Sequence, residues 1–130
     1  MTSHPYNLPK SERLCSHYLI DRLFEPGKGS KSLSSYPLRI VYRPISASEH
    51  GTSILVSVPK KQFKHAVDRN HVKRQIREAY RLNKDLLRTP EGISLNIAFI
   101  WLDNRHYPSA IVTNKVKNLL QRITESCEKS

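Results

Sequence analysis

The stretch "HAVDRNHVKRQIREAYRLNK", residues 65–84, places six arginine and lysine side chains in one short segment. Both side chains bind phosphate groups, and the planar guanidinium group of arginine can donate two parallel hydrogen bonds to one phosphate. So much charge of one sign repels itself unless an anion lies against it. The chemistry that this segment predicts is therefore the binding of a polyanion.

The apolar residues of this segment recur at helical spacing and predict a helix from about Asp68 to Leu87. At about 100° per residue, apolar and basic side chains fall on opposite arcs. The apolar arc holds Val72, Ile76, Ala79, Tyr80, Leu82, Leu86 and Leu87, and the basic arc holds Arg69, Asn70, Lys73, Arg74, Arg77, Arg81, Lys84 and Arg88. The basic arc contains no acidic residue, because Asp68 stands at the helix start, where it favours the helix dipole, and Glu78 lies at the edge of the arc.

The charge of the chain is concentrated around this helix. Residues 60–88 carry ten lysines and arginines but only three acidic residues, a net +7 out of the chain's +11. Lys73, Arg77 and Arg81 repeat the same sign every four residues, and each such pair costs roughly a few tenths of a kcal/mol. A solvated helix face usually mixes both signs, so this pattern favours a polyanionic partner. An anionic membrane surface fits less well, because the apolar arc is needed to cover a sheet and the segment lacks the Trp and Phe of an interfacial anchor.

Nucleic acid, and RNA in particular, is the partner that fits the basic arc. Each neutralised phosphate releases condensed counterions, which offsets the repulsion within the arc. Arginine outnumbers lysine there, and Asn70 adds a donor and an acceptor, which suits a folded RNA or a shaped duplex. These residues alone leave DNA open, but the sequence predicts a strand on either side of the basic helix and no helix-turn-helix pair. This context favours RNA.

The chain lacks the residue patterns of a self-sufficient enzyme. No two of its carboxylates are placed as a general acid and base, since the candidates in and after the basic helix are scattered over Asp68, Glu78, Asp85, Glu91 and Asp103. The six histidines show no metal-ligand spacing with Cys15 or Cys127, and no nucleophile motif or phosphate-binding glycine loop is present. We therefore expect no catalytic residue, no metal site and no cofactor on the protein itself.

The elements around the basic helix predict an α+β fold in the order α-β-β-β-α-β-α. A first helix begins near Ser11 and is stopped by Pro26 and Gly27. Strands are expected at 36–45 and 52–58, and we expect these two to pair with each other. A strand at 94–102 is apolar on both faces and therefore expected to be central, and a short edge strand is expected within 29–35. A last helix is expected over 107–127. A single mixed four-stranded sheet packed with three helices is the simplest arrangement of these elements.

Length and composition predict a single domain over residues 1–130, with loose tails at about 1–10 and 126–130. No apolar run approaches the roughly 18 residues that would indicate a membrane span. A hydrophobic leader is not seen, and Cys15 and Cys127 lie near opposite ends of the chain. The expectation is a soluble cytoplasmic protein whose thiols are reduced.

The segment "SVPKKQFKHAVDRNHVKRQIREAYR", residues 57–81, resembles the protein subunit of bacterial ribonuclease P. The signature of that family is a basic helix of the form RNRxKRxxRE after a strand. The likeness extends more loosely from residue 13 to about 123, including "RLCSHYLIDRLFEPGKG" at 13–29. The resemblance implies that the parallel strands on either side of the basic helix are joined by an unusual left-handed βαβ crossover, against the general right-handed rule.

The resemblance also implies a function. In the family the catalyst is an RNA, and the protein assists it by binding that RNA and the 5′ leader of precursor tRNA, which is removed by hydrolysis. The implied RNA-binding residues are Lys60, Lys61, Lys64, Arg69, Asn70, His71, Lys73, Arg74, Arg77 and Arg81. One protein per RNA is expected, and Mg²⁺ is expected to act through the RNA subunit, where it neutralises phosphates and activates water.

The leader is implied to lie in a cleft between the basic helix and the sheet. Phe24 and Tyr42 match aromatic positions of the family there, although an aromatic residue on an apolar side is also typical of a core. Two positions depart from the family. His71 replaces an arginine of the signature, which leaves that contact neutral or partly charged, and Ile20 replaces the first aromatic residue of the opening helix, which removes a stacking ring.

Two other functions remain open on the sequence. A ribosomal or ribosome-assembly protein could use the same fold and basic helix purely to bind RNA. A stand-alone nuclease is the second alternative, and the lack of paired carboxylates argues against it.

Overall fold

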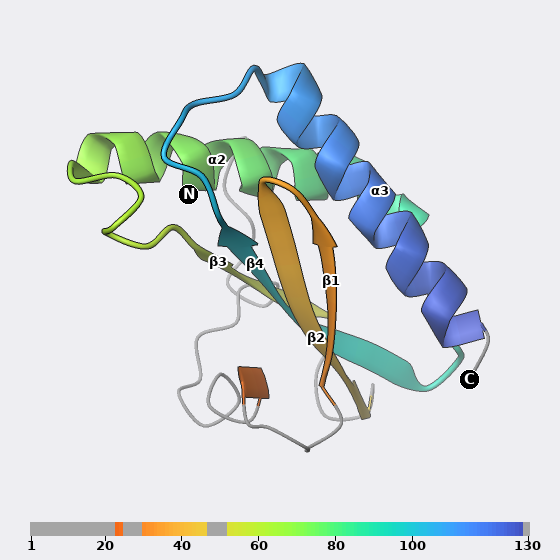
Figure 1. Ribbon diagram of the computed structural model, residues 1–130. Coiled ribbons are helices and arrows are strands. Elements are labelled where there is room, and N and C mark those ends of the chain that lie inside the picture. The colour runs from red at the N-terminus through yellow and green to blue at the C-terminus, as the bar shows by residue number, and fades with distance from the viewer. Residues whose placement is uncertain (1–22, 25–29, 47–51, 129–130) are drawn as a thin grey trace, which may run out of the picture.

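The computed structural model describes residues 23–24, 30–46 and 52–128, which form one mixed sheet and two long helices (Figure 1). The strands are β1 (Lys31–Ser35), β2 (Leu38–Ser46), β3 (Ser53–Ser57) and β4 (Ile93–Trp101), and the helices are α2 (Ala66–Asn83), the short 3-10 helix η2 (Lys84–Leu86) and α3 (Ser109–Glu128). The α+β class and the mixed four-stranded sheet are confirmed. The first predicted helix lies outside the described residues, except for Leu23 and Phe24, which are helical.

The strand order in the sheet is β1-β2-β4-β3. The expected pairing of 36–45 with 52–58 is wrong, because β4 lies between β2 and β3 and pairs with both, antiparallel to β2 and parallel to β3. The reason lies in β4 itself. Seven of its nine residues are buried, and a strand that is apolar on both faces is best placed in the interior of the sheet.

The predicted positions of the edge strand and the central strand are confirmed. Within the described residues β1 pairs with β2 alone, in an antiparallel ladder from Lys31 opposite Tyr42 to Ser35 opposite Leu38, and forms one edge. β3 and β4 are parallel neighbours, and α2 provides the long connection that such neighbours require. The left-handed sense of this crossover stays a prediction.

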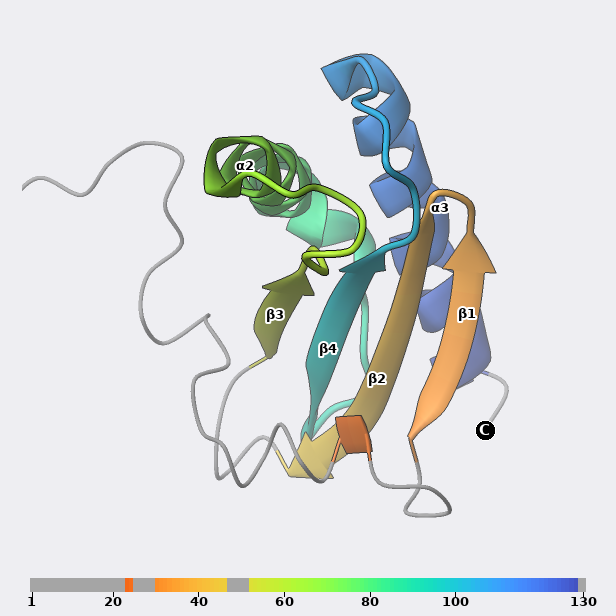
Figure 2. The same cartoon turned by 60° about the vertical axis from the view of Figure 1, so that its left-hand side comes forward.

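Both described long helices cover the same face of the sheet, while Leu23 and Phe24 lie on the other (Figure 2). The main core is formed between the helices and the inward side chains of β2, β3 and β4. Its fully buried members include Leu38, Ile40, Val72, Ile76, Leu95, Ile97, Phe99, Trp101, Val116, Leu119, Leu120 and Ile123. A smaller cluster on the opposite face joins Leu23 to Val41 and Ala98.

The basic helix begins and ends close to the predicted positions. α2 starts at Ala66, two residues before Asp68, and continues through Asn83 into η2, which ends at Leu86. The turn after it is closed as expected: the Ile93 N–H donates to the Pro90 carbonyl at 3.1 Å, and Gly92 has a φ of 83°, which glycine adopts without steric cost.

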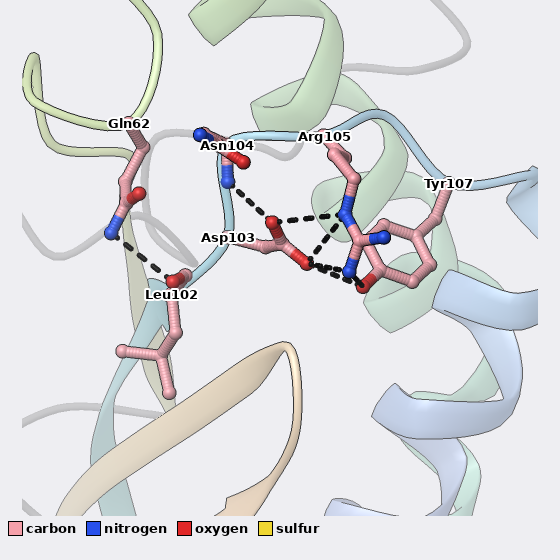
Figure 3. Close-up of polar contacts among 6 residues, drawn as sticks. All are labelled: Gln62, Leu102, Asp103, Asn104, Arg105 and Tyr107. Carbon is pink, nitrogen blue, oxygen red and sulfur yellow. Dashed lines mark hydrogen bonds and ion pairs between the residues drawn. The ribbon is translucent and has the colours of Figure 1, made fainter.

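The loop between β4 and α3 is organised around Asp103 (Figure 3). This carboxylate is only 5% exposed. It accepts hydrogen bonds from the Asn104 backbone N–H at 2.6 Å, from Arg105 Nε at 3.3 Å and Nη2 at 3.0 Å, and from the Tyr107 hydroxyl at 2.5 Å. These bonds close the loop on itself over five residues. We call residues 102–108 the Asp103 loop.

The hydrogen bonds also fix the protonation state of the loop. Donation from Arg105, and then from Tyr107, holds the pKa of the Asp103 carboxyl well below its ordinary value of 3.8. The hydrogen bond to Asp103 in turn raises the pKa of the Tyr107 hydroxyl. Asp103 is therefore charged, and Tyr107 remains a donor, throughout the neutral range.

Replacing Ile76 by alanine should destabilise the fold, because its side chain is fully buried between α2 and the sheet. The expected loss is about 2–5 kcal/mol in the free energy of unfolding, measured by urea denaturation. Arg74→Ala, two residues earlier on the exposed side, is the matched control and should change the free energy by less than about 0.5 kcal/mol. Equal losses from the two variants would mean that the helix faces are wrongly assigned.

The Asp103 loop should make stability depend on acidity. Folding lowers the pKa of the Asp103 carboxyl, so the charged carboxylate stabilises the folded state at pH values above the ordinary pKa of 3.8. This stabilisation is lost progressively as the pH falls below 3.8. Denaturation at several pH values between about 6 and 2.5 should show a shallower acid dependence for Asp103→Asn than for the unchanged protein. Parallel curves would contradict the assigned role of the carboxylate.

Candidate nucleic-acid interface

The predicted basic residues gather on the outward side of α2 and on the loop that leads into it. We call this set the basic surface, and it consists of Lys60, Lys61, Lys64, Arg69, Asn70, His71, Lys73, Arg74, Arg77 and Arg81. Six of these side chains are exposed and four, those of Arg69, Lys73, Arg77 and Arg81, are partly exposed. On the other side of α2, Val72, Ile76, Ala79 and Tyr80 are buried. The separation of the two arcs is thus confirmed.

Two residues of α2 depart from the predicted arcs. Leu82 was placed on the apolar arc but is 60% exposed, although Leu86 farther along the chain packs against the core. Gln75 is buried instead, and its Nε2 donates to the Tyr107 carbonyl at 2.8 Å and to the Ser109 hydroxyl at 3.2 Å. These two bonds satisfy the amide nitrogen at a position that the apolar spacing did not identify, whereas Oε1 accepts no hydrogen bond within the described residues.

Arg69 has a structural role besides its charge. Its Nη1 donates to the carbonyl oxygens of Phe63 at 2.8 Å and Lys64 at 3.0 Å. These bonds attach the loop that carries Lys60, Lys61 and Lys64 to the first turn of α2. One of the three guanidinium nitrogens is therefore committed to holding the basic surface together rather than to binding a partner.

His71 belongs to an aromatic cluster at the N-terminal end of α2. Its ring lies edge-on to that of His106, with 5.0 Å between centroids, and the His106 ring stacks on Phe63 at 4.7 Å. His106 Nε2 is 3.0 Å from Asp68 Oδ1. The sequence pattern does not point to Phe63 or His106 as members of this cluster, because nothing local to either residue places the Asp103 loop beside α2.

The three residues expected to bind the leader are placed differently from one another. Ile20 lies outside the described residues. Phe24 is 45% exposed, next to the buried Leu23, so its ring is accessible on the face opposite the helices. Tyr42 is only 2% exposed and faces the helices, where its hydroxyl donates to Ser126 at 3.0 Å. Its ring has no open side for a nucleotide, so the core interpretation of this residue holds.

The sheet face away from the helices carries a second group of polar residues. Alternation along β2 puts Arg39 and Arg43 on the face opposite Tyr42, and the register puts Asn96 of β4 across from Arg43. Arg39 is exposed and its Nε donates to the Ser32 hydroxyl at 3.1 Å. Asn96 is 1% exposed, and its Oδ1 accepts no hydrogen bond within the described part of the chain. The strand alternation could have identified both arginines.

The described residues contain no group of three or more His, Cys, Asp or Glu side chains that could hold a metal ion. Within the same residues, no helix is long and apolar enough to cross a membrane. The chemistry available to this surface is that of hydrogen-bonding cations, with Asn70 and histidine as polar additions.

Comparison with known proteins identifies the family. Residues 8–124 match the family Ribonuclease P. The chain is 54% identical to the "Ribonuclease P protein component" of Porphyromonas gingivalis over 91 residues, which cover 67% of this chain and 63% of that protein. It is 34% identical to the protein of the same name from Chlorobium phaeobacteroides over 134 residues, which cover 92% of this chain and 90% of that protein.

A solved structure agrees with the sequence matches. The ribonuclease P protein from Thermotoga maritima superimposes with a TM-score of 0.63 at 27% identity, covering 86% of this chain and 97% of that one. The match to the Porphyromonas protein spans less than two thirds of that protein's length, whereas the Chlorobium and Thermotoga matches span nearly the whole of theirs. The chain therefore belongs to the ribonuclease P protein family.

Proposed function

We propose that this chain is the protein subunit of a ribonuclease P ribonucleoprotein and that its basic surface binds the catalytic RNA. The observation that carries this proposal is the exposure of the basic surface on a helix whose opposite side is buried. In a member of this family, such a surface has an RNA as its natural partner. We expect one protein per RNA and a cytoplasmic complex.

Binding is favoured because RNA phosphates would offset the repulsion between the like charges of the basic surface. Lys73, Arg77 and Arg81 lie four residues apart on one helix, so their charges repel one another in the unbound protein. Phosphates placed along this row remove the repulsion and release counterions into solution. Asn70 is exposed beside them and can donate to a phosphate or accept from a 2′-hydroxyl group.

The 5′ leader of precursor tRNA fits the sheet face away from the helices. Arg39 and Arg43 supply charge on this face, and Phe24 supplies an exposed ring on which a nucleotide can stack for about 1–3 kcal/mol. We assign this role to Phe24 but not to Tyr42, whose ring is buried. The leader would thus run along the sheet while the catalytic RNA lies against α2.

The chemical step belongs to the RNA subunit in this proposal. The protein supplies cations that lower the repulsion between two polyanions, the catalytic RNA and its substrate, and so favours their association. Mg²⁺ would enter with the RNA, where it can activate the attacking water and stabilise the leaving oxygen. No side chain of this chain is assigned a part in breaking the phosphodiester bond.

Cleavage of precursor tRNA tests the proposed function directly. The protein should stimulate removal of the 5′ leader by the cognate RNA subunit at low Mg²⁺, because its cations replace part of the ionic screening. A double variant, Lys73→Ala with Arg74→Ala, should reduce this stimulation, measured from the fraction of leader released on a gel. Absence of any stimulation would favour a ribosomal role, and cleavage by protein free of RNA would favour a stand-alone nuclease.

The salt dependence of RNA binding tests the basic surface itself. Arg74→Ala should weaken binding to the cognate RNA and reduce the slope of log K against log salt by about one unit, because one phosphate contact is lost. Lys31→Ala, which removes the same charge from an exposed position on edge strand β1, is the matched control and should leave the slope unchanged. Binding that is indifferent to salt in the unchanged protein would refute the polyanion interface.

A further inference from the structure

The N-terminal end of α2 carries Arg69 and Asn70 but has no cap of its own. The residue at the N-cap position is His65, and its side chain makes no capping hydrogen bond. Backbone N–H groups at a helix start are otherwise satisfied by such a side chain, and its loss typically permits fraying of the first turn. Something else must hold this turn in place.

The Asp103 loop supplies that support through His106. The His106 ring stacks on Phe63, just before α2, with 24° between the ring planes. The same ring contacts Asp68 in the first turn of α2 through Nε2, and its edge meets His71 in the next turn. A single side chain from a distant part of the sequence thus joins the approach to the helix with its first two turns.

Two further hydrogen bonds join the Asp103 loop to α2 and its preceding loop, one on each side of His106 in the sequence. Gln62 Nε2 donates to the Leu102 carbonyl at 3.1 Å, and Gln75 Nε2 donates to the Tyr107 carbonyl at 2.8 Å. The partners on the α2 side span from Gln62 to Gln75, which brackets Lys64, Arg69 and Asn70. The basic surface is therefore fastened to the Asp103 loop along its N-terminal half.

The loop can act as a support only if it is itself rigid, and the buried Asp103 carboxylate provides this. It holds Asn104, Arg105 and Tyr107 through the hydrogen bonds of Figure 3, so the residues on both sides of His106 have fixed positions. Arg105 is 72% exposed, yet its guanidinium group is turned back to the carboxylate. The exposed Arg105 side chain therefore stabilises the conformation of the loop through its ion pair with Asp103.

We propose that Asp103 and His106 are positioning residues of the RNA interface: Asp103 shapes the loop, and His106 holds the N-terminal turns of α2 in the arrangement that binds RNA. This inference rests on the proposed function, because it concerns how that interface is organised. The loop orders Arg69, Asn70 and Lys64 before the RNA arrives, and this reduces the conformational entropy that binding would otherwise cost.

Asp103→Asn provides a test in which charge and positioning predict opposite results. Removing a negative charge from a protein of net +11 should strengthen RNA binding if only the overall field matters. If Asp103 acts by positioning, the variant should instead bind the cognate ribonuclease P RNA roughly two- to tenfold more weakly. Glu125→Gln on the exposed side of α3 removes the same charge away from the loop and should bind as well as the unchanged protein or slightly better.

The salt slope separates positioning from direct contact. His106→Ala should also weaken binding roughly two- to tenfold while leaving the slope of log K against log salt unchanged, because no phosphate contact is lost. The double variant should bind no more weakly than the weaker of the two single variants, since both changes act through the same loop. Affinities are measured well below the melting temperature of each variant, so that loss of folded protein does not enter them. If Asp103→Asn does not fold, His106→Ala still tests the inference, because that side chain is 41% exposed.

The possible outcomes distinguish this inference from the proposed function. If the unchanged protein does not bind the RNA, the proposed function fails. If it binds with a steep salt slope and both loop variants bind equally well, the function stands and the positioning role is refuted. A reduced slope for His106→Ala would also refute positioning, because it would make His106 a direct phosphate contact.

Discussion

Burial of one side of α2 is the constraint on which the rest of this structure depends. The basic surface repels itself, so the helix that carries it cannot be stabilised by its outward side chains. Val72, Ile76, Ala79 and Tyr80 supply the compensation by entering the core with at most 2% of their surface exposed. Apolar burial at about 25 cal/mol per Å² exceeds the cost of several like-charge pairs at a few tenths of a kcal/mol each. The fold can therefore hold a charge pattern that would be unfavourable in an isolated helix.

The central position of β4 gives the sheet two faces with different uses. One face is closed by α2 and α3 and contains the large core, and the other carries a smaller buried cluster of Leu23, Val41 and Ala98. A strand with apolar side chains on both faces is favoured where buried side chains pack against both faces of the sheet. Because α2 connects β3 to β4, the basic surface lies beside the sheet and not on a separate module. The proposed function uses both sides of this arrangement, with the catalytic RNA at the helix and the leader at the sheet face that carries Arg39 and Arg43.

The sequence predicted those features that depend on local periodicity. The two arcs of α2, the closing turn at Pro90 and Gly92, and the buried character of β4 all follow from spacing within one segment, and the structure agrees with them except at Leu82 and Gln75 of α2. The pairing of β2 was predicted wrongly because alternation indicates a strand but not its neighbour, and proximity along the chain suggested β3. The leader role of Tyr42 depended on which side of β2 faces the helices, and alternation alone gives two equivalent sides. His106 was missed because its contacts cross 35 or more residues of sequence to Asp68 and His71.

The support of α2 by the Asp103 loop follows from the same constraint as its burial. Core contacts fix the middle of the helix, through Val72, Ile76 and Ala79, but they do not reach the turn that begins at Ala66. That turn carries Arg69 and Asn70 and has no side-chain cap, so repulsion and fraying act together there. A neutral cap at the position of His65 would satisfy the backbone but would add no contact to the preceding loop, which Phe63 already anchors in the core and Gln62 joins to the Leu102 carbonyl. The arrangement observed instead uses Arg69 to hold the loop carbonyls and His106 to hold Phe63 and Asp68. Loop and helix are thereby fixed as one unit, which is what a surface must be if several of its cations are to meet one RNA backbone at the same time.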